Sequence, residues 1–518
     1  AAILAALFIA VTLLVGDPME TVFAVIQGFI SNNFGWFLVI AVNLYLFFMI
    51  FIAFSRLGSI RLGGKNAVPD FSRLSWFSML FSAGMGIGIL FWSVAEPIYH
   101  FMEPPYGGGS AIDTAKIAMK MTFLHWGLHP WGIYALVGMA LAFFAFNRKL
   151  PLAIRSIFYP LLGEKVHGIW GDLIDVMAVL ATLFGLATSL GFGVQQVNAG
   201  LNHLFDLPDT IGLQVTLVAI ITFIATLSVI SGLDRGVKRL SEMNINLGAI
   251  LLVFVLGLGP SVFILDSYVQ NIGGYLAGFF DVSFWTESYH ASTWQNNWTV
   301  FYWAWWISWS PFVGMFIARI SKGRTVREFV LSVLIIPTLL TFLWITAFGG
   351  AALYIEMNNM GSIAVAIYYL LEQLSFSQIS NFAAIILVVS FFVTSSDSGS
   401  LVVDAFTSGG KLNSPVTQRV FWAALQGAVA AVLLVGGGLS ALQTASITTG
   451  LPFAALLIIM AYSLWKGLEH EHEAEELRAK AVERESYQEL IHRLLHEKET
   501  RDAEENGTPG ETKNQKNT

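Results

Sequence analysis

Aromatic side chains are concentrated in two short apolar segments of the chain. The first segment holds four tryptophans, Trp303, Trp305, Trp306 and Trp309, and the second holds Trp126, Trp131 and Tyr134. On a helix, the last three residues of the first segment share an arc of about 100°, and the residues of the second share about 140°. A trimethylammonium group has no N–H to donate, so aromatic π faces are suited to hold it. We therefore predict an aromatic box for a methylated cation, with plain helix packing as the alternative.

Three glycines alternate along another apolar segment, at Gly84, Gly86 and Gly88, with Met85 between the first two. Such glycines commonly allow close helix packing in membranes. They also lower the cost of leaving helical geometry, and a discontinuous helix exposes carbonyl groups to a cation and N–H groups to a carboxylate. The spacing alone leaves both interpretations open.

Hydroxyl groups are concentrated in the segment from Thr394 to Ser398, which also contains Ser395 and Asp397. Hydroxyls in membrane helices often bond to the carbonyl one turn earlier. Four hydroxyls in five residues exceed that need, and hydroxyl and carbonyl oxygens are hard ligands suited to a small alkali cation. An acid inside a membrane is costly and is a functional candidate by default, but Asp397 could also be structural.

Two further polar features receive structural interpretations. Glu96 precedes Pro97, and we expect the N–H groups freed near the proline to satisfy its carboxylate. His125 and His129 are one helical turn apart and could bind a metal, but the sequence shows no third ligand, so we interpret both as packed or hydrogen-bonded.

The composition of the chain is strongly apolar. Its 518 residues are 55% hydrophobic and 12% charged, with a mean hydropathy of +0.65, whereas soluble proteins carry about 25% charged residues. Continuous apolar runs such as 34–54, 214–230 and 331–354 approach the ~20 residues that span a bilayer as a helix. We therefore predict an all-α polytopic membrane protein. The lack of cysteine excludes disulfides and thiolate metal sites.

Breaks between the apolar runs define twelve predicted spans: 1–15, 34–54, 74–101, 119–146, 172–200, 210–232, 241–265, 297–318, 328–354, 380–405, 418–435 and 443–465. The midpoints of the third, fourth, eighth and tenth spans fall at Gly88, Tyr134, Ser308 and Ser395. The aromatic, glycine and hydroxyl motifs are therefore expected at one depth, near the membrane centre.

Basic residues occupy alternate connections between these spans. They lie at Arg56, Arg61, Lys65, Arg73, Arg148, Lys149, Arg155, Lys165, Arg235, Lys238, Arg239, Arg319, Lys322, Arg324, Arg327, Lys411 and Arg419. The opposite connections hold only Lys116 and Lys120. The positive-inside rule then predicts that both termini are cytoplasmic. Because no Met precedes Ala1, which already lies in an apolar run, we expect the native N-terminus to extend further.

Two segments differ from the spans. Residues 266–296 lack Lys and Arg and are rich in aromatic side chains, so we predict an amphipathic interfacial helix on the external face. Residues 466–518 form a charged, net acidic cytoplasmic tail, which is either a solvated helix or a regulatory one.

The motifs together resemble the betaine/choline/carnitine transporter family, closest to its sodium-coupled glycine betaine carriers. The resemblance is carried by residues 82–88, Glu96 with Pro97, 125–131, 301–312, 318–324 and 391–398, and it extends over all the spans. It implies two peripheral helices in 1–73, an inverted pair of five-helix repeats in 74–265 and 297–465 like that of sodium-coupled amino-acid transporters, and a homotrimer.

The resemblance also implies residue roles. Trp126, Trp131, Tyr134 and Trp306 would form the ammonium box, and Trp303, Trp305 and Trp309 would line the pathway, with Gly84, Met85, Gly86 and Gly88 beside the solute. Sodium would bind to Ser82, Met85, Phe391, Thr394 and Ser395. A second sodium site would fall at Thr182 and Phe312, but Leu186 occupies another hydroxyl position of that pattern and puts it in doubt.

The function implied is sodium-coupled import of glycine betaine across a bacterial inner membrane, for osmoprotection. Choline carriers of the family tend to have an acid at the position of Gly88, and a zwitterion brings its own carboxylate. Ectoine, proline betaine or choline, and proton-coupled or exchange transport, remain alternatives. A channel would show a filter or a charge ring, and an enzyme would need a nucleophile with its base or a metal set. We expect no cofactor beyond Na⁺, and as partners a small solute, sodium and lipids but no nucleic acid.

Overall fold

The computed structural model describes residues 1–84, 86–107, 109–231, 238–289, 292–356, 366–411 and 414–505. Within them the secondary structure is helical apart from one isolated bridge between Arg61 and Thr325. Two compact units divide the chain, Ala1–Trp465 and Lys466–Thr518.

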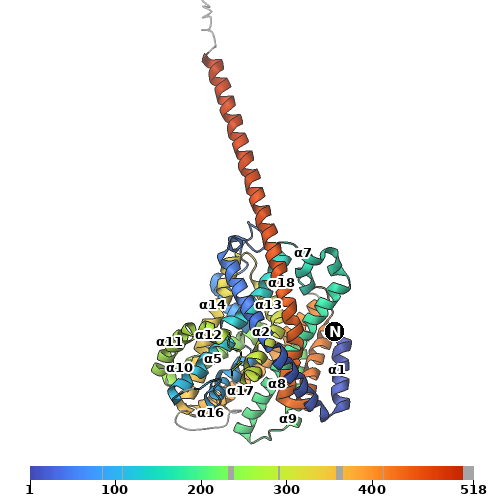
Figure 1. Ribbon diagram of the computed structural model, residues 1–518, viewed down its shortest axis with the longest axis vertical. Coiled ribbons are helices and arrows are strands. Elements are labelled where there is room, and N and C mark those ends of the chain that lie inside the picture. The colour runs from blue at the N-terminus through green and yellow to red at the C-terminus, as the bar shows by residue number, and fades with distance from the viewer. Residues whose placement is uncertain are drawn as a thin grey trace, which may run out of the picture. The chain divides into compact units, whose positions relative to one another are not determined.

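The α-helices are labelled in Figure 1 and follow one another along the chain as α1 (Ala2–Val15), α2 (Pro18–Phe54), α3 (Arg73–Gly84), α4 (Ile87–Met102), α5 (Ala111–Trp126), α6 (Leu128–Phe146), α7 (Tyr159–Leu162), α8 (Ile169–Phe205), α9 (Ile211–Ser231), α10 (Lys238–Leu258), α11 (Ser261–Ala277), α12 (Phe279–Ser283), α13 (Phe301–Ile320), α14 (Val326–Ile345), α15 (Ala351–Glu356), α16 (Ala366–Glu372), α17 (Ser377–Thr407) and α18 (Val416–Glu505). Short 3₁₀ turns occupy Arg56–Ser59, Ile154–Phe158 and Gly163–His167. π-Helical turns occupy Asn296–Val300 and Thr346–Gly350.

Eight stretches of helix in the described residues are long and apolar enough to cross a membrane. The chain is therefore a multi-pass α-helical membrane protein, as predicted. Each predicted span coincides with helix, and the backbone of Gly437 and Gly438 kinks α18 between the last two. The number of crossings and the inverted repeat remain predictions. The helix in span 241–265 ends earlier than predicted, at Leu258, because Gly259 and Pro260 follow it.

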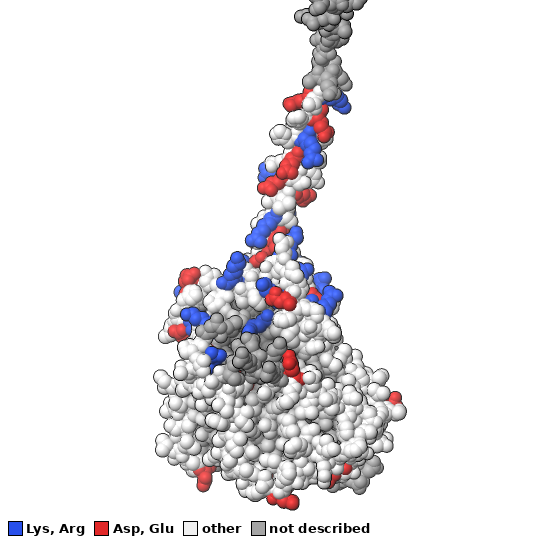
Figure 2. Space-filling view, turned by 180° about the vertical axis from the view of Figure 1, so that it is seen from behind, with Lys and Arg blue, Asp and Glu red and all other residues white. Residues whose placement is uncertain are grey.

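Three of the basic connections lie together. Arg61 Nη1 donates to Gly323 O at 2.6 Å, and Asn147 Nδ2 donates to Arg61 O at 2.9 Å. The backbone N–H of Leu62 donates to Arg324 O at 2.9 Å. Figure 2 shows Lys and Arg side chains gathered toward one end of the unit Ala1–Trp465, beside a broad surface with almost no charged residues.

Two interruptions place the aromatic motifs. Helix α3 ends at Gly84 and α4 begins at Ile87, with Gly86 in an extended conformation (φ −132°, ψ −174°). The helix is therefore discontinuous here, which was one of the two interpretations that the glycine spacing left open. A second break at Gly127 separates α5 from α6. A Cβ on Gly127 would lie 2.4 Å from Phe123 O and 2.8 Å from the Phe342 ring. Trp126 therefore does not share a continuous helix with Trp131 and Tyr134, and the single arc predicted for these residues was wrong.

Helices α6 and α13 approach closely because glycines face each other. A Cβ on Gly314 would lie 2.6 Å from the Val137 side chain and 3.1 Å from Gly138 N. Small residues of this kind let membrane helices come together. The contact fixes the helix that carries Tyr134 against the helix that carries Trp306.

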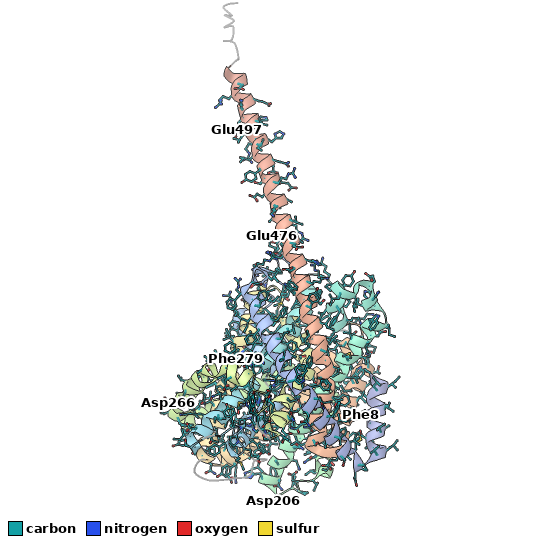
Figure 3. The ribbon with its side chains drawn as sticks, in the orientation of Figure 1. Phe8, Asp206, Asp266, Phe279, Glu476 and Glu497 are labelled. Carbon is teal, nitrogen blue, oxygen red and sulfur yellow. The ribbon has the colours of Figure 1, made fainter. Side chains whose placement is uncertain are left out.

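The segment predicted to be interfacial contains the end of α11 and all of α12. Phe279, labelled in Figure 3, lies with its ring centroid 5.3 Å from that of His129. In the separate unit Lys466–Thr518, α18 continues as helix to Glu505. Exposed apolar residues Tyr487, Leu490 and Leu494 recur there at helical spacing among charged residues such as Glu476 and Glu497 (Figure 3). A regulatory role for this helix remains a prediction.

Candidate functional site

Four aromatic rings from three helices form a continuous cluster, which we call the aromatic box. Trp126 ends α5, Trp131 and Tyr134 lie on α6, and Trp306 lies on α13. Trp126 and Trp306 meet edge to face, with centroids 4.8 Å apart, and Tyr134 lies 6.3 Å from Trp306 and 5.5 Å from Trp131. All four side chains are buried. The structure thus brings together the four residues predicted for the box, and among described residues the Tyr134 hydroxyl has no hydrogen-bond partner.

Two further tryptophans of α13, Trp305 and Trp309, lie outside the box, and Trp305 is in contact with it. Trp305 stacks on Trp306 at 4.6 Å with an interplanar angle of 15°. Its indole N–H is directed at Ser189 Oγ (3.2 Å) and Gly185 O (3.3 Å), and Trp309 Nε1 also donates to Gly185 O, at 3.1 Å. Helix α8 therefore fixes the orientation of both rings.

Trp303 has different surroundings. Its ring is fully buried and stacks on His129 at 5.3 Å, with His125 at 5.8 Å. These contacts place it at the junction of α5 and α6, outside the group of rings that surrounds Trp306. A pathway-lining role for Trp303 remains a prediction.

The glycines beside the helix break are required by the tryptophans. A Cβ on Gly86 would lie 3.0 Å from Trp309 Cη2. A Cβ on Gly88 would lie 2.7 Å from Trp305 Cη2 and 3.3 Å from Trp126 Cη2. The first turn of α4 is therefore in direct contact with the rings of the box. Gly84 ends α3, and Met85 lies outside the described residues.

A cavity of about 80 Å³ contains the predicted sodium ligands in the described part of the chain. Ser82, Phe391, Thr394 and Ser395 line it, together with Ser241, Asn244, Ser398, Trp309, Phe312, Val313 and Phe316. Thr394 Oγ1 accepts from Asn244 Nδ2 at 2.9 Å and lies 3.0 Å from Ser390 O, which accepts its proton. The hydroxyl and amide oxygens at the wall are the donor type that a small hard cation prefers.

The residues of the second predicted sodium site are less favourable. Phe312 lines the same cavity, but Thr182 is not among the described residues that line it. The Thr182 hydroxyl donates to Ala178 O at 2.7 Å, one turn earlier on α8. Leu186 packs against Gly399, where a Cβ would lie 2.4 Å from its Cδ1. Asp397 is fully buried on α17 and does not line the cavity.

A buried carboxylate lies next to the box, and its environment was not predicted. Glu96 Oε2 accepts from Trp126 Nε1 at 2.7 Å and from the Tyr302 hydroxyl. Glu96 Oε1 lies 2.7 Å from His125 Nδ1 and 3.1 Å from His100 Nε2. The expectation that freed backbone N–H groups satisfy Glu96 was wrong, because α5 and α13 supply side-chain donors instead. The spacing of Glu96 and His100, one turn apart on α4, was the available sequence signal.

The same atoms are the best candidate for a metal in the described residues. One ligand atom each from Glu96, His100 and His125 lie within 4.8 Å of one another. The sequence analysis paired His125 with His129, but the neighbours of His125 in this group are Glu96 and His100 of α4. The Nε2 atom of His129 instead lies 3.3 Å from Asn43 Oδ1. Hydrogen bonds already engage both carboxylate oxygens and both nitrogens of His125, whose Nε2 lies 2.9 Å from Thr299 Oγ1. Among the nitrogen and oxygen atoms of these three side chains, only His100 Nδ1 has no hydrogen-bond partner in the described part of the chain.

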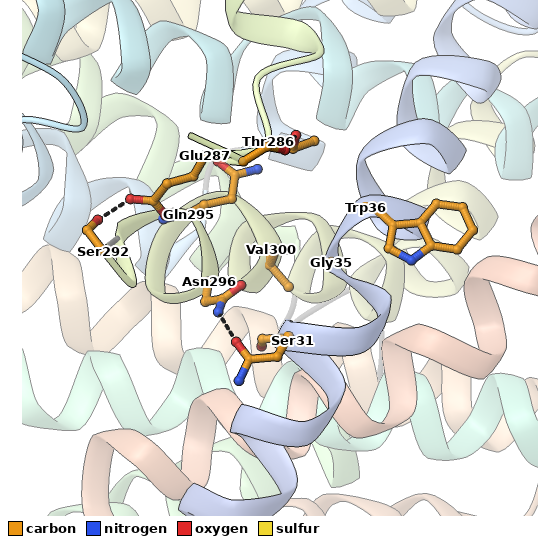
Figure 4. A pocket seen from close by; sticks show the side chains of 11 residues that line it. Ser31, Gly35, Trp36, Thr286, Glu287, Ser292, Gln295, Asn296 and Val300 are labelled. Carbon is orange, nitrogen blue, oxygen red and sulfur yellow. Dashed lines mark hydrogen bonds between the residues drawn. The ribbon is translucent and has the colours of Figure 1, made fainter. Parts of the chain in front are cut away.

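A larger cavity of about 290 Å³ lies between α2 and residues 286–288 and 292–300 (Figure 4). Its wall is mostly polar, with the Glu287 carboxylate accepting from Gln295 N at 2.8 Å and from Ser292. Trp36 is its only aromatic wall residue in the described chain, and 57% of that side chain is exposed. This cavity therefore lacks the means to surround a methylated cation.

The amino-acid sequence is similar to those of known transporters. A sequence model described as betaine/carnitine/choline family transporter matches residues 1–473. The chain is 47% identical over 487 residues to a glycine betaine/proline/choline/ectoine transporter of Vibrio parahaemolyticus, covering 90% of this chain and 85% of that one. It is 45% identical over 472 residues to a glycine betaine transporter of Acinetobacter baylyi (89% and 71% covered). It is 41% identical over 483 residues to a probable glycine betaine transporter of Desulfitobacterium hafniense (90% and 96% covered).

Proposed function

The chain belongs to the betaine/carnitine/choline family of transporters, and we propose that it imports glycine betaine by sodium-coupled symport with alternating access. Membership makes the protein a membrane transporter of betaine-type solutes rather than an enzyme. The solute, the coupling ion and the direction of transport are the parts that we propose.

The aromatic box is the observation that carries the choice of solute. Four ring faces or edges from α5, α6 and α13 lie within 6.3 Å of their neighbours. A methylated ammonium group gains about 0.5–1 kcal/mol from a well-placed ring at an exposed site, and about 2 kcal/mol or more when it is desolvated.

The start of α4 supplies the complementary feature for a zwitterion. The first N–H groups of a helix have no intrahelical partner and attract anions. Gly88 lies in this first turn and is close to Trp126. A solute with an ammonium group at one end and a carboxylate at the other matches the box and the helix start together. Choline lacks the carboxylate and would leave the helix start unused.

Sodium coupling is supported by the small hydroxyl-lined cavity. Ser82 of α3 and Thr394 and Ser395 of α17 provide oxygens from two helices, so a cation between them would tie the helices together. Trp309 borders the same cavity and also touches Gly86. An ion there is thus linked through one ring to the solute site. Each sodium ion entering contributes about 2.3 kcal/mol per 100 mV of membrane potential. A second ion at Thr182 and Phe312 has no comparable support.

The distribution of charge supports the orientation. The converging basic connections would face the cytoplasm under the positive-inside rule, in a bacterial inner membrane, with both termini on that side. We also propose twelve crossings with two inverted five-helix repeats, since discontinuous helices such as α3 and α4 are typical of that architecture. The homotrimer and the osmoprotective role are proposed from family membership alone.

Uptake into proteoliposomes tests the proposal. Labelled glycine betaine, ectoine, choline and carnitine are each offered with and without an inward sodium gradient. We expect betaine to accumulate most, and only with the gradient. Accumulation of betaine that ignores sodium would contradict the coupling, and no accumulation of betaine under either condition would contradict the proposed solute.

A further inference from the structure

Glu96 connects three of the helices that build the solute site. It lies on α4, and its side chain is fully buried. One oxygen accepts from Trp126 of α5 and from Tyr302 of α13, and the other lies against His100 of α4 and His125 of α5. Removing a carboxylate from water costs free energy, which hydrogen-bond donors must compensate. Here each oxygen of Glu96 has two partners.

This network holds the indole N–H groups of two of the three box tryptophans, Trp126 and Trp306. Trp126 Nε1 donates to Glu96 directly, at 2.7 Å. Trp306 Nε1 donates to the backbone carbonyl of His125 at 2.8 Å, and the imidazole of the same histidine contacts Glu96 at 2.7 Å. Tyr302 also packs against both tryptophans, because its ring centroid lies 5.8 Å from those of Trp126 and Trp306. The relative orientation of the two rings therefore depends on one carboxylate.

The carboxylate also affects the electron density of the box. A hydrogen bond from an indole N–H to an anion in a low-dielectric environment pushes electron density into the ring. A more negative ring face attracts a cation more strongly, whereas an uncharged group of the same shape gains nothing. The Nε1 edge of Trp126 faces Glu96, and its opposite edge, at Cη2, faces Gly88 in the first turn of α4. The ring thus separates the buried anion from the solute side.

We propose that Glu96 is a positioning residue that sets the strength of the aromatic box for a cationic headgroup, by orienting Trp126 directly and Trp306 through His125 and by polarising the Trp126 ring. This inference rests on the proposed function, because it concerns the same solute site. It assigns Glu96 no contact with the solute.

Glu96→Gln is the informative substitution, because it removes the charge and keeps the shape. The amide oxygen can still accept from Trp126 and Tyr302, and the amide N–H groups can donate to neutral His100 and His125. Tyr302→Phe is a second variant that keeps the charge and removes one donor. Tyr45→Phe is the matched control, since the Tyr45 hydroxyl is equally buried and donates to Ala454 O at 2.6 Å, outside the network.

Two solutes separate the charge from the shape. Glycine betaine is the transported solute, and 3,3-dimethylbutanoate, in which a tert-butyl group replaces trimethylammonium, is the competing inhibitor. KM and kcat for sodium-driven betaine uptake, and Ki for the isostere, are measured in proteoliposomes with each variant. Loss of binding that is equal in the ground and transition states raises KM without changing kcat.

For Glu96→Gln we expect the KM for betaine to rise about tenfold, with kcat within about twofold of wild type and the Ki of the isostere changed less than about threefold. Tyr302→Phe should raise KM less, and Tyr45→Phe should leave all three quantities unchanged.

An unchanged KM in Glu96→Gln would overturn the inference, as would equal rises in KM and Ki, which would indicate a structural role only. Sensitivity of wild-type uptake to a chelator would also overturn it, in favour of a metal between Glu96, His100 and His125. Should wild-type protein fail to take up betaine, the proposed function itself fails, and the two failures are thereby distinguished.

Discussion

The indole rings of Trp126 and Trp306 meet edge to face at 4.8 Å, although one ends α5 and the other lies in the second turn of α13. Both rings are buried, and their N–H groups donate to Glu96 Oε2 and to His125 O, respectively. Trp305 stacks on one face of Trp306, so the solute contact that we propose is with the opposite face. The proposed solute site is built around this pair, and α6 adds Trp131 and Tyr134 to it.

Replacing Trp306 tests the box by removing its central ring. We expect Trp306→Ala to abolish betaine uptake, because Trp306 contacts both Trp126 and Tyr134. Trp306→Phe keeps a π face but loses the bond to His125 O, and should raise the KM about three- to tenfold. Uptake is measured in proteoliposomes, with size-exclusion profiles to confirm folding. Trp36→Ala is the control, since Trp36 is largely exposed and lies at the other cavity. Wild-type uptake by Trp306→Ala would remove the box from the mechanism.

Gly88 is predicted to tolerate no side chain. A Cβ there would lie 2.7 Å from Trp305 Cη2, so Gly88→Ala must displace the ring or the first turn of α4. Overpacking of this kind costs about 1–3 kcal/mol. We expect a lower thermal unfolding midpoint and a loss of uptake. Gly28→Ala on α2 is the matched control, because nothing lies within 4 Å of its Cβ position. Full uptake by Gly88→Ala would show that the rings can yield and that the contact does not matter.

Much of this site was predictable from residue types and spacing, because aromatic, glycine and hydroxyl side chains are unusual at the centre of an apolar span. The group of aromatic residues was obtained in that way, whereas the choice of Trp126, Trp131, Tyr134 and Trp306 among them followed from the family resemblance. The break between Gly84 and Ile87 was one of two interpretations that the spacing left open. The break at Gly127 was missed, since a single glycine inside an apolar run gives no distinctive pattern, and Trp126 was consequently placed on the wrong helix. The partners of Glu96 on other helices were not predictable, because the sequence does not specify how the helices that carry Trp126 and Tyr302 pack against α4.

Thr394 tests the assignment of the coupling ion. Its hydroxyl lies at the wall of the small cavity with Ser82 and Ser395. Thr394→Ala removes one oxygen ligand, and we expect the sodium concentration for half-maximal uptake to rise about tenfold or more. Thr407→Ala, on the same helix, is the control, because the Thr407 hydroxyl bonds to Val403 O at 3.0 Å away from that cavity. An unchanged sodium dependence in Thr394→Ala would show that the ion binds elsewhere.

The orientation can be measured directly because the chain has no cysteine. A single cysteine is introduced at Ser59, next to the basic connections, or at Ser288, at the mouth of the polar cavity beside α2. We expect a membrane-impermeant thiol reagent to label Ser288→Cys in intact cells and to label Ser59→Cys only after lysis. The reverse pattern would invert the proposed topology.

The most direct test is an experimental density map of the protein with bound glycine betaine in the presence of sodium. We expect the trimethylammonium group of betaine within about 6 Å of the ring centroids of Trp126, Trp131, Tyr134 and Trp306, with its carboxylate toward the first turn of α4. Density for betaine in the cavity beside Trp36, or a headgroup away from all four rings, would show that the aromatic box is not the solute site.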